Sequence, residues 1–209
     1  MGRYTMPNYH YRDIAVCVEG CKRFEASLAC PVPDEEGALY QKRGVMLLGE
    51  APGKEERDGL KPFIGPAGGW LNRAIAEGGY PNLRDQLYLL NVVRCYAQGN
   101  PPPTKAEIEF HRPFVLEAIN EANPACIVLL GAIPLKFFSI TGGVGSRQGQ
   151  KIPWEGRVLC PTYHPSYAMR KRSEHYRGRI GKDIEAAWDL AQQIKNQPKR
   201  EPIREIPRS

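Results

Sequence analysis

The chain has 209 residues, a net charge of +6 and six cysteines, and its apolar and charged fractions are ordinary for a globular protein. This length fits one domain with a sizeable core. No apolar run is long enough to cross a membrane and no secretory leader stands at the amino terminus, which argues against membrane-embedded and secreted classes. We therefore expect a cytoplasmic monomer whose cysteines bind metal or stay as buried thiols, because the cytosol keeps thiols reduced.

The first informative segment is irregular and contains Cys17, Cys21 and Cys30 among glycine and proline residues. A pair of cysteines separated by three residues fits a zinc loop, an iron–sulfur loop or two unrelated thiols. The segment therefore predicts a ligand loop whose metal the spacing alone leaves open.

A buried strand is predicted over residues 45–48, where four apolar residues run without interruption. The glycines and prolines of residues 49–69 then force the backbone out of regular structure at the carboxyl end of the strand, where ligands bind in open α/β sheets. Glu50 and Phe63 lie in this stretch and suggest a carboxylate beside a stacking surface. The alternative is an acidic loop residue and a core phenylalanine. The P-loop and dinucleotide glycine patterns are both absent.

Helices and strands alternate over the rest of the chain. Further strands are predicted over residues 86–93, 127–130 and 158–160, and helices over 67–76, 134–140 and 180–194, with another helix begun by a capping box at Thr104 and Glu107. This alternation predicts an α/β fold, a three-layer sandwich in which a small four-stranded parallel sheet is flanked by helices. We expect one domain over residues 1–197 and a disordered, proline-rich tail over 198–209.

Helical spacing after Thr104 places four side chains on one face: Ile108, His111, Val115 and Ile119. His111 is therefore expected to point inward, where a hydrogen-bonded core histidine is the usual occupant. Cys126 and Cys160 lie in or beside strands and are expected to be packed thiols.

Positive charge is concentrated between residues 147 and 182, where nine lysines and arginines and two acidic residues give a net charge of +7. Tyr163, Tyr167 and Tyr176 are interleaved with these basic residues. Such a mixture is typical of surfaces that bind nucleic acids. The alternative is a basic face that is only solvated.

Four segments, in this order and spacing, resemble the motifs of the family 4 uracil-DNA glycosylases, the iron–sulfur branch of that superfamily. They are Gly-Glu-Ala-Pro-Gly at residues 49–53, Pro-Phe-Ile-Gly at 62–65, Asn-Val-Val-Arg-Cys at 91–95 and Tyr-His-Pro-Ser-Tyr at 163–167. The resemblance extends over about residues 17–195. It implies a uracil-DNA glycosylase fold and an enzyme that flips uracil out of DNA and hydrolyses its N-glycosidic bond, leaving an abasic site.

The resemblance also implies roles in catalysis. Glu50 would stabilise the sugar cation and position or deprotonate the attacking water, and His164 would donate a hydrogen bond to uracil O2 as negative charge grows on the leaving base. Phe63 would stack on the base, and Asn91 would pair with its edge. The uracil-binding set that it implies is Gly49, Ala51, Phe63 and Asn91.

The segment after His164 is expected to hold the DNA through Ser166, Tyr167, Met169, Arg170 and Arg172. Met169 and Tyr167 are candidates for an apolar wedge that fills the gap left by a flipped base, and the arginines are candidates for phosphate contacts. The alternative for Met169 is packing into the core.

The resemblance implies a structural [4Fe-4S] cluster, but the ligand pattern departs from the family. Cys17 and Cys21 fit the first two positions with one extra residue between them, and Cys95 fits the third. The residue sixteen positions beyond Cys95 is His111 instead of cysteine. The fourth ligand is His111 or Cys30. His111 is favoured because it occupies the expected sequence position and lies on the inward face of its helix. A three-coordinate or lost cluster is also open.

One other function stays open, and a third is argued against by the sequence. A catalytically weak relative could bind DNA or partners through the same fold. Another branch of the superfamily traps uracil-DNA covalently through a histidine on an arginine-rich inserted loop, but here only five residues, Tyr-Ala-Gln-Gly-Asn, separate Cys95 from Pro101.

Overall fold

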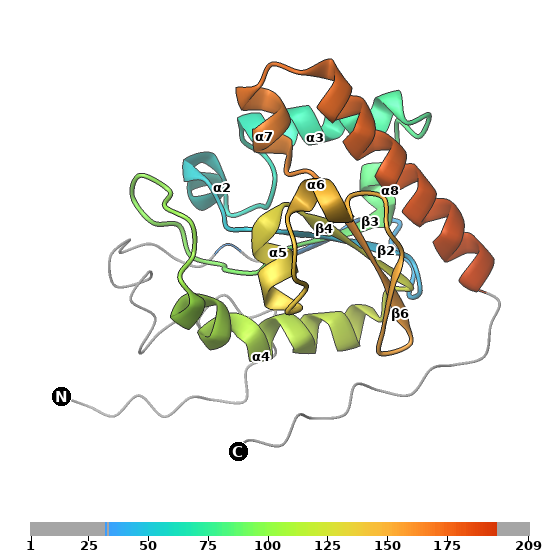
Figure 1. The fold of residues 1–209 in the computed structure, drawn as a ribbon, viewed down its shortest axis with the longest axis horizontal. Helices are drawn as coiled ribbons and strands as arrows, with labels where there is room; N and C mark the ends of the chain where they lie inside the picture. The colour runs from blue at the N-terminus through green and yellow to red at the C-terminus, as the bar shows by residue number, and fades with distance from the viewer. Residues whose placement is uncertain (1–31, 33, 196–209) are drawn as a thin grey trace.

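The computed structural model describes residue 32 and residues 34–195, and their centre is a single mixed sheet (Figure 1). Within these residues the strand order is β1-β3-β2-β4-β6-β5. The strands are β1 (Glu35–Glu36), β2 (Val45–Gly49), β3 (Leu87–Asn91), β4 (Cys126–Leu130), β5 (Ile152–Trp154) and β6 (Arg157–Thr162). The four strands across the middle of the sheet, β3, β2, β4 and β6, are parallel, as predicted. The two short edge strands, β1 and β5, are antiparallel to their neighbours.

Helices cover both faces of the sheet and give the three layers that the sequence predicted (Figure 1). The longer helices are α3 (Pro66–Glu77), α4 (Lys105–Ala122) and α8 (Glu174–Ile194). The shorter ones are α2 (Lys54–Gly59), α5 (Ala132–Phe137), α6 (Val144–Arg147), α7 (Pro165–Arg170) and the 3-10 helix η2 (Leu83–Gln86). None of the described helices is long and apolar enough to cross a membrane.

Alternating side chains of the central strands belong to two separate hydrophobic cores, one on each face of the sheet. On β2, Val45 and Leu47 pack with residues of α3 and α8, whereas Met46 and Leu48 pack with residues of α4 and α5. All five residues of β2 are buried, because helices cover both faces of a parallel sheet. The sheet is therefore fixed from both sides, and the carboxyl ends of its strands are held in fixed relative positions.

Several elements differ from the sequence prediction. The helix expected over residues 180–194 begins earlier, at Glu174, because the Ser173 hydroxyl accepts a hydrogen bond from the Tyr176 amide and caps the first turn. The edge strands and the short helices α2, α6 and α7 were not predicted, since two to six residues are too few to show a period. The predicted tail over residues 198–209 lies outside the described residues.

Candidate active site

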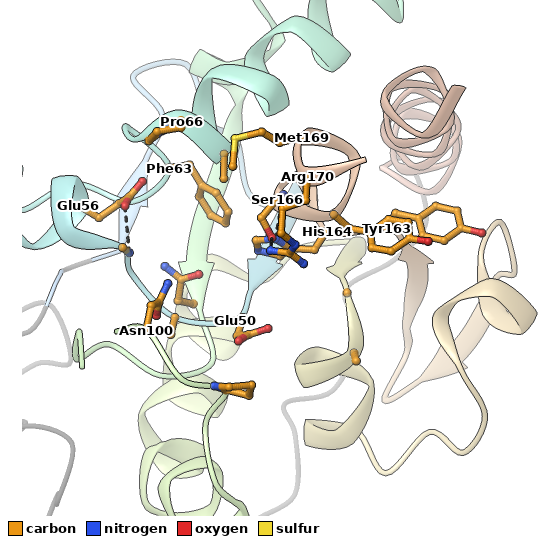
Figure 2. A pocket seen from close by; sticks show the side chains of 18 of the residues that line it. Glu50, Glu56, Phe63, Pro66, Asn100, Tyr163, His164, Ser166, Met169 and Arg170 are labelled. Atoms are coloured by element: carbon orange, nitrogen blue, oxygen red, sulfur yellow. Dashed lines mark hydrogen bonds between the residues drawn. The ribbon is translucent and has the colours of Figure 1, made fainter. Parts of the chain in front are cut away.

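The carboxyl ends of β2, β3 and β6 open into one cleft of about 980 Å³. This volume lies within the range of roughly 300–1,000 Å³ that is typical of ligand sites. Figure 2 shows Glu50, Phe63 and His164 facing the same space from different parts of the chain. The cleft is lined by nine of the predicted residues: Glu50, Ala51, Phe63, Asn91, His164, Ser166, Tyr167, Met169 and Arg170.

Gly49 lies beneath the cleft and lets two of these residues approach each other. A Cβ atom at this position would stand 2.4 Å from Asn91 Oδ1 and 2.5 Å from Phe63 Cζ, so any side chain would displace them. The backbone continues the pairing beyond the strands, since the amides of Val92 and Val93 donate to the carbonyls of Gly49 and Glu50 at 3.0 Å each. Glu50 is thereby held half-buried at the cleft wall.

Phe63 reaches the cleft from a strained loop between α2 and α3. Its φ of 55° lies in the left-handed region, which costs a residue with a side chain about 1–2 kcal/mol. Glu56 of α2 ties this loop to the start of α2, because its two carboxylate oxygens accept from the amides of Gly53 at 2.9 Å and Gly65 at 2.7 Å. The ring itself is 6% exposed, so it is a fixed wall of the cleft.

Asn91, the last residue of β3, is buried in the cleft wall with an unused acceptor. Its side chain is 6% exposed, and its Oδ1 accepts no hydrogen bond from the described part of the chain. An acceptor that is buried without a partner costs about 1–3 kcal/mol, which a ligand with a matching donor would recover. The position therefore favours a ligand that presents an N–H group to Asn91.

The hydrogen bonds of His164 fix its tautomer. The Ser166 amide donates to His164 Nδ1 at 3.2 Å, and the Ser166 hydroxyl lies 2.7 Å from the same nitrogen. Because an amide can only donate, Nδ1 is the acceptor and the neutral ring carries its proton on Nε2. Burial and the positive charge of Arg170 lower the pKa of His164 to about 4, so the ring is a neutral donor at pH 7.

A buried polar cluster anchors the turn that carries His164. Asp183 of α8 accepts from the Thr162 hydroxyl at 2.6 Å and from Gln148 Nε2 at 2.7 and 2.9 Å. Thr162 ends β6, two residues before the histidine. On the other side, Gly131 makes room for the ring, since a Cβ there would stand 2.9 Å from His164 Cβ.

Helix α7 brings the predicted DNA-binding residues to the mouth of the cleft. Met169 is half-buried and lines the cleft in place of packing into the core, and Arg170 is exposed and donates to the Ser166 hydroxyl at 3.1 Å. Arg172 is exposed just beyond the helix and does not line the cleft.

The basic segment is less uniform than its sequence suggests. Arg157 is 4% exposed and bonds to the Glu155 carbonyl and to Asn123, and Arg177 forms an ion pair with Glu77 at 2.8 Å. These two arginines support the fold. Most of the other basic residues are exposed, which is what a polyanion-binding face requires.

Two of the predicted cluster ligands, Cys95 and His111, are fully buried and lie outside the cleft. His111 Nδ1 donates to the Glu107 carbonyl at 2.8 Å, so the neutral ring has an unprotonated Nε2, the arrangement found in histidines that bind metals. Within residues 32 and 34–195, no three His, Cys, Asp or Glu side chains gather around a common metal position. Cys17, Cys21 and Cys30 lie outside the described residues.

Several residues that build the site carry no signal in the sequence. Glu56 stands in the charged run from Lys54 to Asp58, which is typical of a solvated surface. Tyr96 and Asn100 line the cleft from the loop after Cys95 and have no distinguishing pattern.

Comparison with known proteins identifies relatives over most of the chain. The sequence model of the Uracil DNA glycosylase superfamily matches residues 37–192. A type-4 uracil-DNA glycosylase of Thermotoga maritima is 38% identical over 177 residues, which cover 79% of this chain and 90% of that protein. Proteins of the same name from Pyrobaculum aerophilum and Sulfurisphaera tokodaii are 34% and 32% identical, over 71% and 78% of this chain and 78% and 76% of their own lengths. The chain therefore belongs to the type-4 uracil-DNA glycosylases, within the uracil DNA glycosylase superfamily.

Proposed function

We propose that this protein excises uracil from DNA by hydrolysing the N-glycosidic bond, which leaves an abasic site. The observation that carries the proposal is the unused buried acceptor of Asn91 beside the ring of Phe63, in a cleft that also contains Glu50 and His164. The names of the relatives support the same reaction. We further propose that it acts as a monomer.

Recognition of the base follows from the amide of Asn91. Its Oδ1 would accept from uracil N3–H and its Nδ2 would donate to O4, while Phe63 stacks on the ring. Cytosine presents an acceptor at N3 and a donor at the 4-position, so both contacts would be lost at about 1–3 kcal/mol each. A base can make these contacts only after it has left the stack.

Bond cleavage places negative charge on the base and positive charge on the sugar. The neutral His164, protonated on Nε2, would donate to uracil O2 as the charge develops there. Glu50 would stabilise the sugar cation and position or deprotonate the attacking water. The Ser166 amide and hydroxyl would hold the histidine in the required tautomer through their contacts with Nδ1, and Arg170 would hold the hydroxyl by donating to it.

The mouth of the cleft would hold the DNA. Met169 and Tyr167 would enter the gap that the flipped base leaves, and Arg170 and Arg172 would contact the adjacent phosphates. The substrate proposed is therefore a DNA strand that contains uracil, with α7 against its backbone.

A structural [4Fe-4S] cluster would be held by Cys17, Cys21, Cys95 and either His111 or Cys30. The tautomer of His111 and the complete burial of Cys95 and His111 fit this use. When bound, the cluster would cross-link the amino-terminal segment to β3 and α4, and it would take no part in hydrolysis. The Val32 amide donates to the Arg94 carbonyl at 2.9 Å, so residue 32 lies next to the residue that precedes Cys95.

The direct test is incubation with a labelled oligonucleotide that contains one uracil, followed by alkali and a denaturing gel. We expect a single alkali-dependent break at the uracil position. An intact strand that is retarded on a native gel would instead indicate a relative that binds DNA without catalysis, and a covalent adduct that survives denaturation would indicate the trapping reaction.

Glu50→Gln and His164→Ala are each expected to slow uracil release by roughly 10²-fold or more, because both side chains act on charge that exists only in the transition state. Affinity for uracil-containing DNA should stay close to that of the parent. Single-turnover rates and a binding titration measure the two effects. A variant that cleaves at the parental rate would remove that residue from the mechanism.

The lowered pKa of His164 predicts a pH dependence of stability. The folded pKa of about 4 lies below the ordinary value of 6.5, so the unfolded chain binds the proton more readily. The stabilisation from neutral His164 is complete above pH 6.5 and is lost as the pH falls from 6.5 towards 4. Between pH 7 and pH 5, the free energy of unfolding should therefore fall more steeply in the parent than in His164→Gln. Equal slopes in urea titrations would show an ordinary pKa.

Met169→Ala should impair excision from duplex DNA more than from single-stranded DNA, since only the duplex has a stack that must be opened. Arg172→Ala is the matched comparison: it should weaken activity on both substrates and reduce the salt dependence of binding by about one phosphate contact. An equal loss on the two substrates for Met169→Ala would make its role structural.

Protein purified without oxygen is expected to contain about four irons per chain. Cys95→Ala should lose the iron, and comparison of His111→Ala with Cys30→Ala should identify the fourth ligand by metal analysis. Cys160→Ala is the control, because this buried thiol lies on the sheet face beneath α8 and should leave the iron content unchanged. Zinc without iron would contradict the proposal.

A further inference from the structure

The guanidinium of Arg84, which lies outside the cleft, binds the backbone of Phe63, whose ring forms part of the cleft wall. Arg84 of η2 donates from Nη1 to the Phe63 carbonyl at 3.3 Å and from Nη2 to the Pro62 carbonyl at 3.0 Å. The same group donates to Asn72 Oδ1 on α3 at 3.0 Å and to Glu35 Oε2 on β1 at 3.1 Å. A planar guanidinium with five donors can serve four acceptors in this way, whereas an ammonium has three.

The backbone at Phe63 needs such support because its conformation is unfavourable. Its φ of 55° is one that residues with side chains rarely adopt. Gly68 of α3 packs against the same peptide, and a Cβ there would stand 1.9 Å from the Phe63 carbonyl oxygen. The carbonyl therefore contacts both a helix backbone and a cation, and a rotation of this peptide would move the ring.

We propose that Arg84 is a positioning residue for base recognition: it fixes the left-handed backbone of Phe63 and so holds the ring where a flipped base stacks. This deepens the proposed function and rests on it. Arg84 does not line the cleft, and it lies outside the four motif segments. Its effect therefore passes through Phe63, with Glu35 on β1 supplying the countercharge.

The variant Arg84→Met removes the guanidinium and keeps an apolar stem. We expect the single-turnover rate of uracil release to fall roughly 10- to 100-fold, since a small misplacement of a positioned group has effects of that size. The inhibition constant of free uracil should rise by a similar factor, while affinity for DNA that contains an abasic site stays unchanged. Arg112→Met is the matched control, because Arg112 also bonds a backbone carbonyl, that of Phe137 at 2.8 Å, and pairs with Glu109. The control should change none of these values.

A double-mutant cycle tests whether Arg84 affects uracil release through Phe63. In a Phe63→Ala background, Arg84→Met should add less than about twofold, because residues that act through one another are not additive. Arg84→Lys should be intermediate, since it keeps the charge and fewer donors. If Arg84→Met does not fold, Arg84→Lys carries the same comparison.

Hydrogen exchange of the amides in residues 60–68 tests whether Arg84 fixes the backbone of Phe63, and it does so independently of uracil release. Exchange there should be faster in Arg84→Met than in the parent and in Arg112→Met, whether or not uracil is released. Parental protection in that segment, a parental rate of release, or full additivity with Phe63→Ala would each overturn the role of Arg84. If the parent protein releases no uracil but exchange is faster in Arg84→Met, the proposed function is wrong, whereas the role of Arg84 in fixing the Phe63 backbone is retained.

Discussion

The close approach of Asn91 and Phe63 over Gly49 is the constraint on which the rest of the site depends. A single missing Cβ allows an amide and an aromatic ring to meet at the carboxyl ends of two neighbouring strands, at distances that a side chain would abolish. Parallel pairing of β2 with β3 then fixes the amide, and the loop between α2 and α3 fixes the ring. In the proposed function, these two fixed side chains would recognise one face and one edge of a planar base.

The proposed catalytic residue His164 is held by a second set of contacts, made by α8 and the turn after β6. Asp183 ties α8 to the end of β6, and the turn after this strand presents His164 with Nδ1 already occupied. The chain therefore selects the neutral, Nε2-protonated ring before any substrate arrives, which is the preorganisation that stabilises charge developing in a transition state. Glu50 lines the same cleft from the turn after β2, so in the proposed function the base and the sugar would be contacted by different elements.

Long patterns in the sequence predicted the layers of the fold, whereas features that depend on single contacts were missed. Each of the four parallel strands contains an apolar run, and the face shared by Ile108, His111 and Val115 shows helical spacing, so the layers and the burial of His111 were predictable. The roles of Glu56 and Arg84 were not predictable, because charged residues in short helices look solvated until the amides and carbonyls that they bind are in place. The motif resemblance identified nine of the residues that line the cleft, whereas the loop after Cys95, which adds Tyr96 and Asn100, carries no pattern of its own.

The central claim is that the unused acceptor of Asn91 selects uracil by its N3–H group. The most direct measurement compares the release of uracil and of cytosine from matched single-stranded oligonucleotides by the parent protein and by Asn91→Asp, whose ionised side chain can only accept. We expect the parent to release uracil alone. The variant should lose much of the preference for uracil and shift towards release of cytosine. Unchanged uracil release and unchanged discrimination in Asn91→Asp would contradict it and would remove Asn91 from base recognition.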